Sequence, residues 1–409
     1  MTLIPMTAGR GLRAAGVAAL LALAAAGAPA GPFVPADDDN IVERLPPRGD
    51  AAQRARRAAL ARDPQQLPLA LAAAQQAIVR ARHDGDPREL GSAQAALAPW
   101  WRDPQAPAPV RLLRATILQS RHDFAAAQAD LDPLVADGAT PAALRAQALL
   151  TRASLQQLRG RFAAARADCE ALQQPAFAML GDALQRTARA CLLELQSLTG
   201  DPHQARRAFD ALADAAGGDP WLDLLRAELA ERLGDDPVAQ RHYAAASAGG
   251  EVYPLAAFAD WLLDRGRARE ALTVLERGPA QADALLLRRA IAWHRLGDAR
   301  ADATAARLRE RLAAIRLRGD SPHLREEARL ALDIDRDAPR ALALAREQWA
   351  LQKEPADAVL LWRAALAVGA AADYGAPASL VRELGGWLPD PARADVRLVG
   401  PPAATRSLP

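Results

Sequence analysis

One pattern of apolar and polar residues occurs twice in this chain. Leu155–Leu172 reads LQQLRGRFAAARADCEAL, and Leu195–Leu212 reads LQSLTGDPHQARRAFDAL. Leucines, a glycine, an alanine and an arginine occupy the same places in both. In each copy a first apolar segment ends, a glycine marks a turn, and a second apolar segment begins. This arrangement predicts a repeated helical hairpin.

The same arrangement extends along most of the chain. Aligned on the residue that closes a first helix and opens a second, the turns fall at Gly85, His122, Gly160, Gly200, Gly234, Gly266 and Gly297. A small residue follows five positions later, at Ala127, Ala165, Ala205, Ala239 and Ala271. A larger one comes four positions after that, at Leu131, Cys169, Phe209, Tyr243 and Leu275. Two helices can cross closely only where a side chain is small, so we expect the alanines at the crossings.

Helix is expected from Asp50 to about Leu388. Alanine, leucine and arginine dominate the composition and lose little entropy in a helix. Asp-Pro occurs eight times, and we interpret most of these pairs as helix starts, because aspartate caps free N–H groups and proline fits the first turn. Residues 31–49 are expected to form an irregular lead-in, and residues 389–409 a mostly disordered tail.

Steps of 31 to 40 residues between turns, with small and larger residues at fixed places, resemble the tetratricopeptide repeat (TPR) family. The resemblance covers roughly residues 67–370. The repeats are degenerate, since the steps vary, an early aromatic is mostly missing and Asp302 stands where alanine belongs. The resemblance implies an all-α superhelix, a solenoid whose first helices line a concave face and bind a protein or peptide.

The first 30 residues predict a cleaved signal peptide. Arg10 and Arg13 precede the apolar stretch from Ala14 to Ala26, and a small-x-small pattern ends at Ala30. Removing this segment takes the formal charge from +2 to 0, which argues against a nucleic-acid partner. No later apolar run has membrane length. The mature protein is therefore expected to be periplasmic or secreted from a bacterium.

We find no motif that predicts catalysis, a metal site or a cofactor. Phosphate loops, nucleophile elbows and paired metal-binding motifs are absent, and the six histidines lie far apart in the sequence. Glycan-cleaving helical enzymes use paired carboxylates and aromatic platforms, and the aromatic content here is only 4%. We therefore expect a protein that is not an enzyme.

Cys169 and Cys191 leave two possibilities open. Both could be buried thiols in neighbouring hairpins. The expected oxidising compartment and the even count favour a disulfide, whereas an axial offset between the two helices argues against it.

The register of the resemblance places a run of acidic residues and one tryptophan on the concave face. The predicted partner-binding residues are Glu194, Trp221, Glu228, Glu231, Asp260 and Asp264. We expect solvated side chains there and a protein or peptide partner that is basic. The function expected is an exported scaffold or adaptor in the bacterial envelope. The alternatives are a structural subunit of a polysaccharide-export or cell-wall machine and, least favoured, a glycan-cleaving enzyme.

Cleavage of the signal peptide is testable by intact mass. Protein purified from the periplasm of an expressing bacterium should begin near Gly31. A chain that still begins at Met1 and stays in the cytosol would contradict the predicted export.

Overall fold

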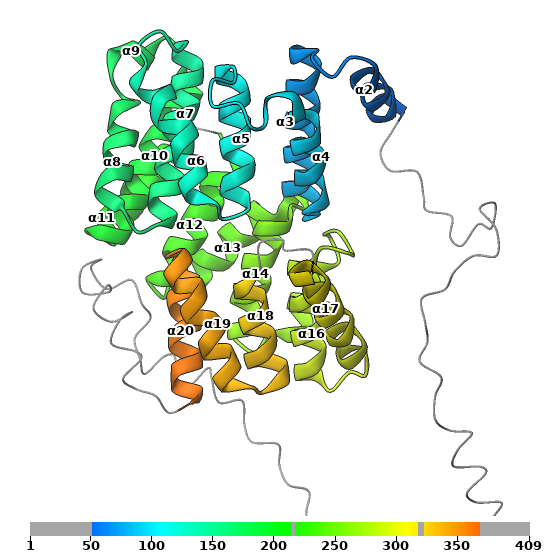
Figure 1. Ribbon diagram of the computed structural model, residues 1–409. Coiled ribbons are helices and arrows are strands. Elements are labelled where there is room, and N and C mark those ends of the chain that lie inside the picture. Colours follow the sequence, from blue (N-terminus) through cyan, green and yellow to red (C-terminus); the bar gives the residue numbers. More distant parts are fainter. Residues whose placement is uncertain (1–50, 215–216, 318–322, 369–409) are drawn as a thin grey trace, which may run out of the picture. The chain divides into compact units, whose positions relative to one another are not determined.

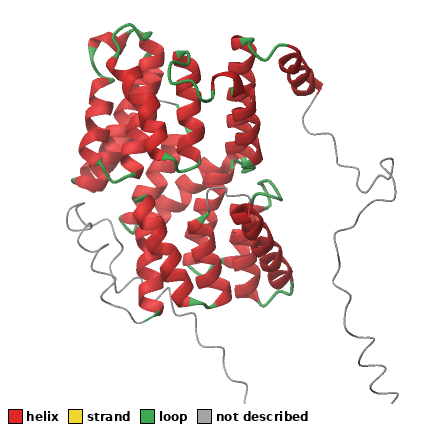
Figure 2. Ribbon diagram, in the orientation of Figure 1, coloured by secondary structure: helices red, strands yellow, loops and turns green. Residues whose placement is uncertain are grey.

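The computed structural model describes residues 51–214, 217–317 and 323–368, and every regular element in these ranges is a helix (Figures 1 and 2). The chain divides into two compact units after Arg54. The first unit contributes only the start of α2 (Ala51–Arg62), and the rest of this description concerns the second. The predicted all-α class is confirmed. The predicted signal peptide, lead-in and tail lie outside the described residues.

Consecutive helices pair into hairpins, and successive hairpins stack to form a TPR-like solenoid. The pairs are α3 (Leu67–Asp84) with α4 (Arg88–Ala96), α5 (Ala108–Ser120) with α6 (Phe124–Ala136), α7 (Ala142–Leu158) with α8 (Phe162–Ala171), α10 (Asp182–Thr199) with α11 (Pro202–Asp214), α12 (Pro220–Arg232) with α13 (Asp236–Ala246), α14 (Val252–Asp264) with α15 (Ala268–Leu275), and α16 (Asp283–Leu296) with α17 (Arg300–Leu317). Then follow α18 (Leu324–Leu330), which continues as a π-helical turn (Ala331–Asp335), α19 (Ala338–Leu351) and α20 (Pro355–Ala367). The short helix α9 (Pro175–Ala178) lies between α8 and α10.

The hairpin turns fall at the residues on which the sequence was aligned. Six of the seven have a left-handed backbone, with φ between 60° and 73°; Gly200 is the exception. At five turns the residue after the aligned one donates its N–H to the carbonyl five residues earlier, as Asp123 does to Leu118. This bond satisfies an orphan carbonyl at the helix end. His122 holds the same conformation at φ 60° without being glycine.

The aligned alanines are fully buried. Ala127, Ala165, Ala205, Ala239 and Ala271 each have a relative exposure of 0%. The larger residues one turn later are at most 1% exposed. The small alanine side chains let the two helices of a hairpin approach each other. The larger residue one turn later fills the space against the next hairpin.

Four of the seven Asp-Pro pairs in the described residues lie at helix starts, and three do not. Asp219 caps α12, and its carboxylate accepts from the N–H of Trp221. The pair at 132–133 lies inside α6 instead. The pairs at 63–64 and 103–104 lie in links several residues before the next helix. Packing of the α6 face tolerates the proline there, although it removes a helical hydrogen bond.

A repeated ion pair inside the hairpins escaped the sequence analysis. Arg114 and Asp130 pair through two hydrogen bonds of 2.7 and 2.5 Å. Arg152 and Asp168, both 38 positions later, pair in the same way at 2.9 and 2.6 Å. Each pair joins the first helix of a hairpin to the second. The arginine and the aspartate have the same spacing in both hairpins. The two adjacent copies therefore share this ion pair as well as their buried alanines.

The array also contacts itself beyond neighbouring hairpins. A Cβ placed on Gly85, at the end of α3, would lie 3.0 Å from the Ala282 side chain and 3.2 Å from that of Val252. In Figure 1 the helices α16–α20 lie below α5–α11. None of the described helices is both long and apolar enough to cross a lipid bilayer.

Overpacking one crossing tests the hairpin register. Ala205→Leu adds volume at a fully buried position of α11 and should lower the free energy of unfolding by about 1–3 kcal/mol. The matched control is Ala211→Leu, an exposed alanine on the same helix, which should change stability little. Equal melting temperatures for the two variants would show that α11 crosses its neighbour elsewhere.

Candidate functional site

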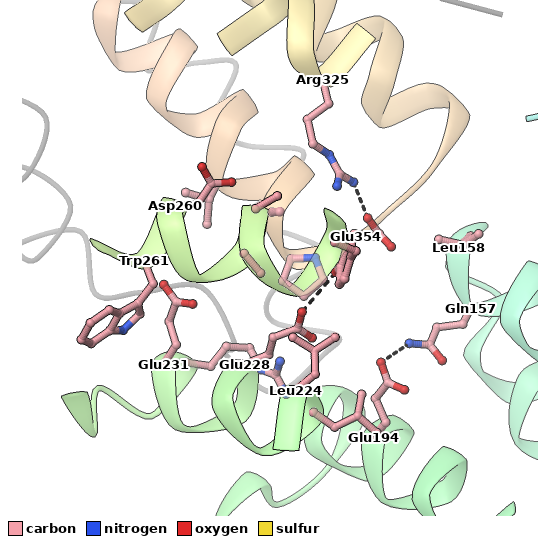
Figure 3. Close-up of a pocket in the computed structure, with 18 of the residues that line it drawn as sticks. Gln157, Leu158, Glu194, Leu224, Glu228, Glu231, Asp260, Trp261, Arg325 and Glu354 are labelled. Atoms are coloured by element: carbon pink, nitrogen blue, oxygen red, sulfur yellow. Dashed lines mark hydrogen bonds and ion pairs between the residues drawn. The ribbon is translucent and has the colours of Figure 1, made fainter. Parts of the chain in front are cut away.

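A cavity of about 880 Å³ lies inside the solenoid. One part of its wall comes from the first helices of successive hairpins, α7, α10, α12 and α14. Another part comes from α18, from the link before α20 and from α20 itself, and α3, α13 and α16 add single residues or pairs. All six residues predicted to bind a partner line this one cavity: Glu194, Trp221, Glu228, Glu231, Asp260 and Asp264. Figure 3 shows how the labelled acids among them lie around it.

The acids are not freely solvated as expected, because most of them accept hydrogen bonds from neighbouring helices. Glu194 accepts from the Gln157 side chain at 2.7 Å. Tyr253 donates its hydroxyl proton to Glu228 at 3.1 Å, and Tyr243 donates to Glu231 at 2.6 Å. The bonds to Glu194 and Glu228 join first helices of successive hairpins, and the bond to Glu231 joins the two helices of one hairpin. All three satisfy groups that stacking has removed from bulk water.

Asp260 differs from the other acids because two guanidinium groups hold it. Arg288 donates to both of its oxygens at 3.0 and 2.7 Å, and Arg329 also pairs with it. Burial alone would raise the pKa of Asp260, but the two arginines outweigh burial and lower it. Asp260 therefore serves as an anchor between hairpins and is not an available charge.

The cavity as a whole is balanced in charge, contrary to the expectation of an acidic face. Seven acidic and seven basic side chains line it, and the bases come mostly from helices that the sequence analysis did not consider. The basic residues are Arg82, Arg232, Arg288, Arg325, Arg329, Lys353 and Arg363. Most of these bases pair with acids outside the predicted set, as Arg325 does with Asp357 at 2.6 Å.

An acidic region remains around α10 and α12. Burial raises the pKa of Glu194. Burial and the nearby Glu194 carboxylate raise the pKa of Glu228 to about 8, with Glu354 adding to the effect. Burial raises the pKa of Glu231 to about 7. Arg232 is the cation near Glu194 and Glu228, and it also donates to Ser197 at 2.7 Å, while Arg265 lies 3.7 Å from Glu231. These carboxyl groups are short of positive charge, so a cation placed among them would be stabilised.

Two aromatic side chains face the same space. Trp221 is 39% exposed and Tyr253 is 53% exposed, although both line the cavity. Water therefore reaches Tyr253. An exposed ring beside carboxylates suits a ligand that carries both a positive charge and apolar surface.

Cys169 and Cys191 form a disulfide with their Cα atoms 6.2 Å apart. The axial offset that argued against the bond is small enough to be spanned, since this separation lies within the usual range. Cys169 is fully buried, whereas Cys191 lines the cavity. The bond joins α8 to α10 across two successive hairpins.

Several residues around the cavity were missed by sequence analysis. Tyr253, Arg325, Lys353 and Glu354 line it, yet only Tyr253 belongs to a hairpin that was aligned in detail. Lys353 is the only lysine in the chain. That isolation was the one signal in the sequence that could have singled it out.

Comparisons with known proteins give a similar solved structure. No protein-family model matches the sequence, and no curated protein matches it either. A crystal structure of a tetratricopeptide repeat protein from Parabacteroides merdae is similar, with 13% sequence identity and a TM-score of 0.37. The similarity covers 62% of this chain and 97% of that one. The TPR-like description rests on the hairpins of this chain itself.

The raised pKa values predict how stability depends on pH. A carboxyl group with a raised pKa binds more protons folded than unfolded between its two pKa values. The contribution of these groups to the free energy of unfolding should therefore fall as pH rises from about 4.5 to 8. Glu228→Gln should flatten this fall, so that the variant gains stability over the wild type at pH 8 but not at pH 4.5. Urea unfolding at both pH values measures the difference.

The exposed Glu310 provides the control for that experiment. Glu310→Gln removes the same charge from the outer surface of α17 and should leave the pH dependence unchanged. If Glu228→Gln and Glu310→Gln show the same slope as the wild type, Glu228 is not desolvated in the folded protein.

Proposed function

We propose that this chain is an exported, non-catalytic interaction module that takes a basic segment of another envelope protein into its cavity. The observation that carries the proposal is the convergence of Glu194, Glu228, Trp221 and Tyr253 on one cavity from successive first helices. An extended segment could contact several of these helices in turn. The N-terminal segment that resembles a signal peptide supports the envelope location.

The ligand chemistry follows from the acidic region. Desolvated carboxyl groups with a deficit of cations favour a guanidinium or ammonium group. Trp221 and Tyr253 would add cation–π and apolar contact to the same side chain. A volume of about 880 Å³ accommodates a few side chains of a peptide and is too small for a folded domain.

The cavity also meets one condition for the alternative of a glycan-cleaving enzyme, since it holds carboxyl groups of raised pKa near aromatic rings. However, Glu231 is bound to the buried Tyr243, and Asp260 is locked between two arginines. Glu231 thus joins the two helices of one hairpin, and Asp260 joins its hairpin to later helices. Binding without turnover is the function that these contacts favour.

A defined peptide array tests the proposal. Acetylated nonapeptides of basic, neutral and acidic composition would be screened, and affinities of the best binders measured by fluorescence anisotropy. Basic peptides should bind best, and their affinity should weaken as salt is raised, because exposed charges are screened. Glu194→Gln combined with Glu228→Gln should reduce affinity by about tenfold or more.

The matched control removes two charges from the outer surface. Glu276→Gln combined with Glu310→Gln changes two exposed acids and should leave binding intact. Asp260 is kept in both variants because its ion pairs hold the fold. If basic peptides show no preference, or if both double variants bind alike, the cavity is not the binding surface. A structural role within a larger assembly then becomes the better explanation.

A further inference from the structure

The wall of the cavity is closed by a contact between parts of the chain that are far apart in sequence. We call this contact the seam. It is formed by Leu158, Gly160, Phe162 and Leu198 of α7, α8 and α10 on one side, and by Trp349, Leu351, Lys353 and Ala358 around α19 and α20 on the other. Elsewhere between α12 and α18 a continuous apolar core joins successive hairpins. The seam has no such core.

Little apolar surface holds the seam. Its centre consists of the buried Leu198 and Ala358, with Phe162 and Trp349 packed beside them. Leu351 adds a partly buried contact to the core of α5–α7. Hydrophobic stabilisation scales with buried apolar area, so this contact is weaker than the hairpin stacking around it.

One hydrogen bond crosses the seam within the described parts of the chain. The backbone N–H of Lys353 donates to the carbonyl of Leu158 at 2.7 Å. The Lys353 stem then lies against Gly160, where a Cβ would be only 2.9 Å from its Cδ. The Lys353 ammonium donates to the Trp349 carbonyl at 2.8 Å, on its own side of the seam.

Acidic side chains from both sides of the seam line the cavity. Glu354 follows Lys353 directly and acts on Glu194 and Glu228 of α10 and α12, disfavouring ionisation of both. Figure 3 shows Glu354 paired with Arg325 and Glu194 with Gln157, each on its own side of the cavity. A positive charge between these carboxylates would turn the repulsion into attraction from both walls.

We propose that the seam is a side gate to the cavity, which parts between Gly160 and Lys353, and that a cationic ligand closes it by bridging Glu194 and Glu228 to Glu354. The gate itself is independent of the proposed function. Closure by a cation rests on it, since it assumes that basic ligands enter this cavity.

The single lysine provides a direct readout of the gate. An amine-reactive acetylating reagent can label only Lys353 and the N-terminal amine, and peptide mapping separates the two. Burial lowers the pKa of Lys353, so opening alone would raise that pKa and leave a smaller fraction of the amine unprotonated. Faster labelling of Lys353 therefore reports greater access to the amine.

Two glycines at equivalent turns provide a matched pair of variants. Gly160 and Gly266 have φ values of 69° and 73°, so alanine is strained to a similar degree at both. Only at Gly160 would the new methyl group meet Lys353, because nothing lies within 4 Å of a Cβ at Gly266. Lys353 should be labelled roughly tenfold faster in the Gly160→Ala variant than in the Gly266→Ala variant. The two variants should have similar melting temperatures.

The ligand arm uses an acetylated, amidated Arg-Gly-Arg peptide, which carries no amine to consume the reagent. It should slow Lys353 labelling severalfold in the wild type and have no effect in the Glu194→Gln, Glu228→Gln double variant. Equal labelling of Gly160→Ala and Gly266→Ala would overturn the gate. Unchanged labelling while the peptide binds by anisotropy would overturn closure by a cation and leave the proposed function standing. Absence of peptide binding would contradict both the proposed function and closure by a cation. The gate would then be decided by comparing Lys353 labelling in the two glycine variants.

Discussion

The close crossing of two helices at an alanine is the constraint on which the rest of this structure depends. A methyl group at Ala127, Ala165 or Ala205 lets the backbones approach, and each hairpin then exposes an apolar face that only another hairpin can cover. The chain must therefore continue stacking. Because the crossings are made by small side chains, the protein builds a long core with few aromatic residues, and it concentrates several of them in α13 and α14, where Tyr243, Phe258 and Trp261 pack together.

Stacking also decides what happens to the polar face. The first helices turn their carboxylates and glutamines toward one another, so a side chain that looks solvated on an isolated helix gains a partner on the next one. Glu194 with Gln157 and Glu228 with Tyr253 are examples. The same stacking removes water, which leaves some carboxyl groups desolvated and receptive to a cation. Packing and candidate recognition thus arise from a single arrangement of helices.

The turns, the buried alanines and the six cavity-lining residues could be predicted from the sequence because each depends on spacing within one hairpin or between neighbours. The opposite wall could not be predicted in this way. Arg325, Lys353 and Glu354 reach the cavity only because the array coils back on itself, and small rotations between hairpins add up over many repeats to bring them there. The neutralisation of Asp260 by Arg329, which lies 69 residues away, was hidden for the same reason. The proline inside α6 shows that packing can override the tendency of proline to end a helix.

The disulfide between Cys169 and Cys191 has a consequence for cooperativity. In a linear array each hairpin contacts mainly its neighbours, so unfolding can begin at an end and advance one hairpin at a time. A covalent bond between α8 and α10 ties two neighbouring hairpins into one unit. Unfolding that advances along the array cannot pass Cys169 without also unfolding the next hairpin. Oxidation would thus merge two steps of a stepwise transition into one larger step, beside the seam that closes the cavity.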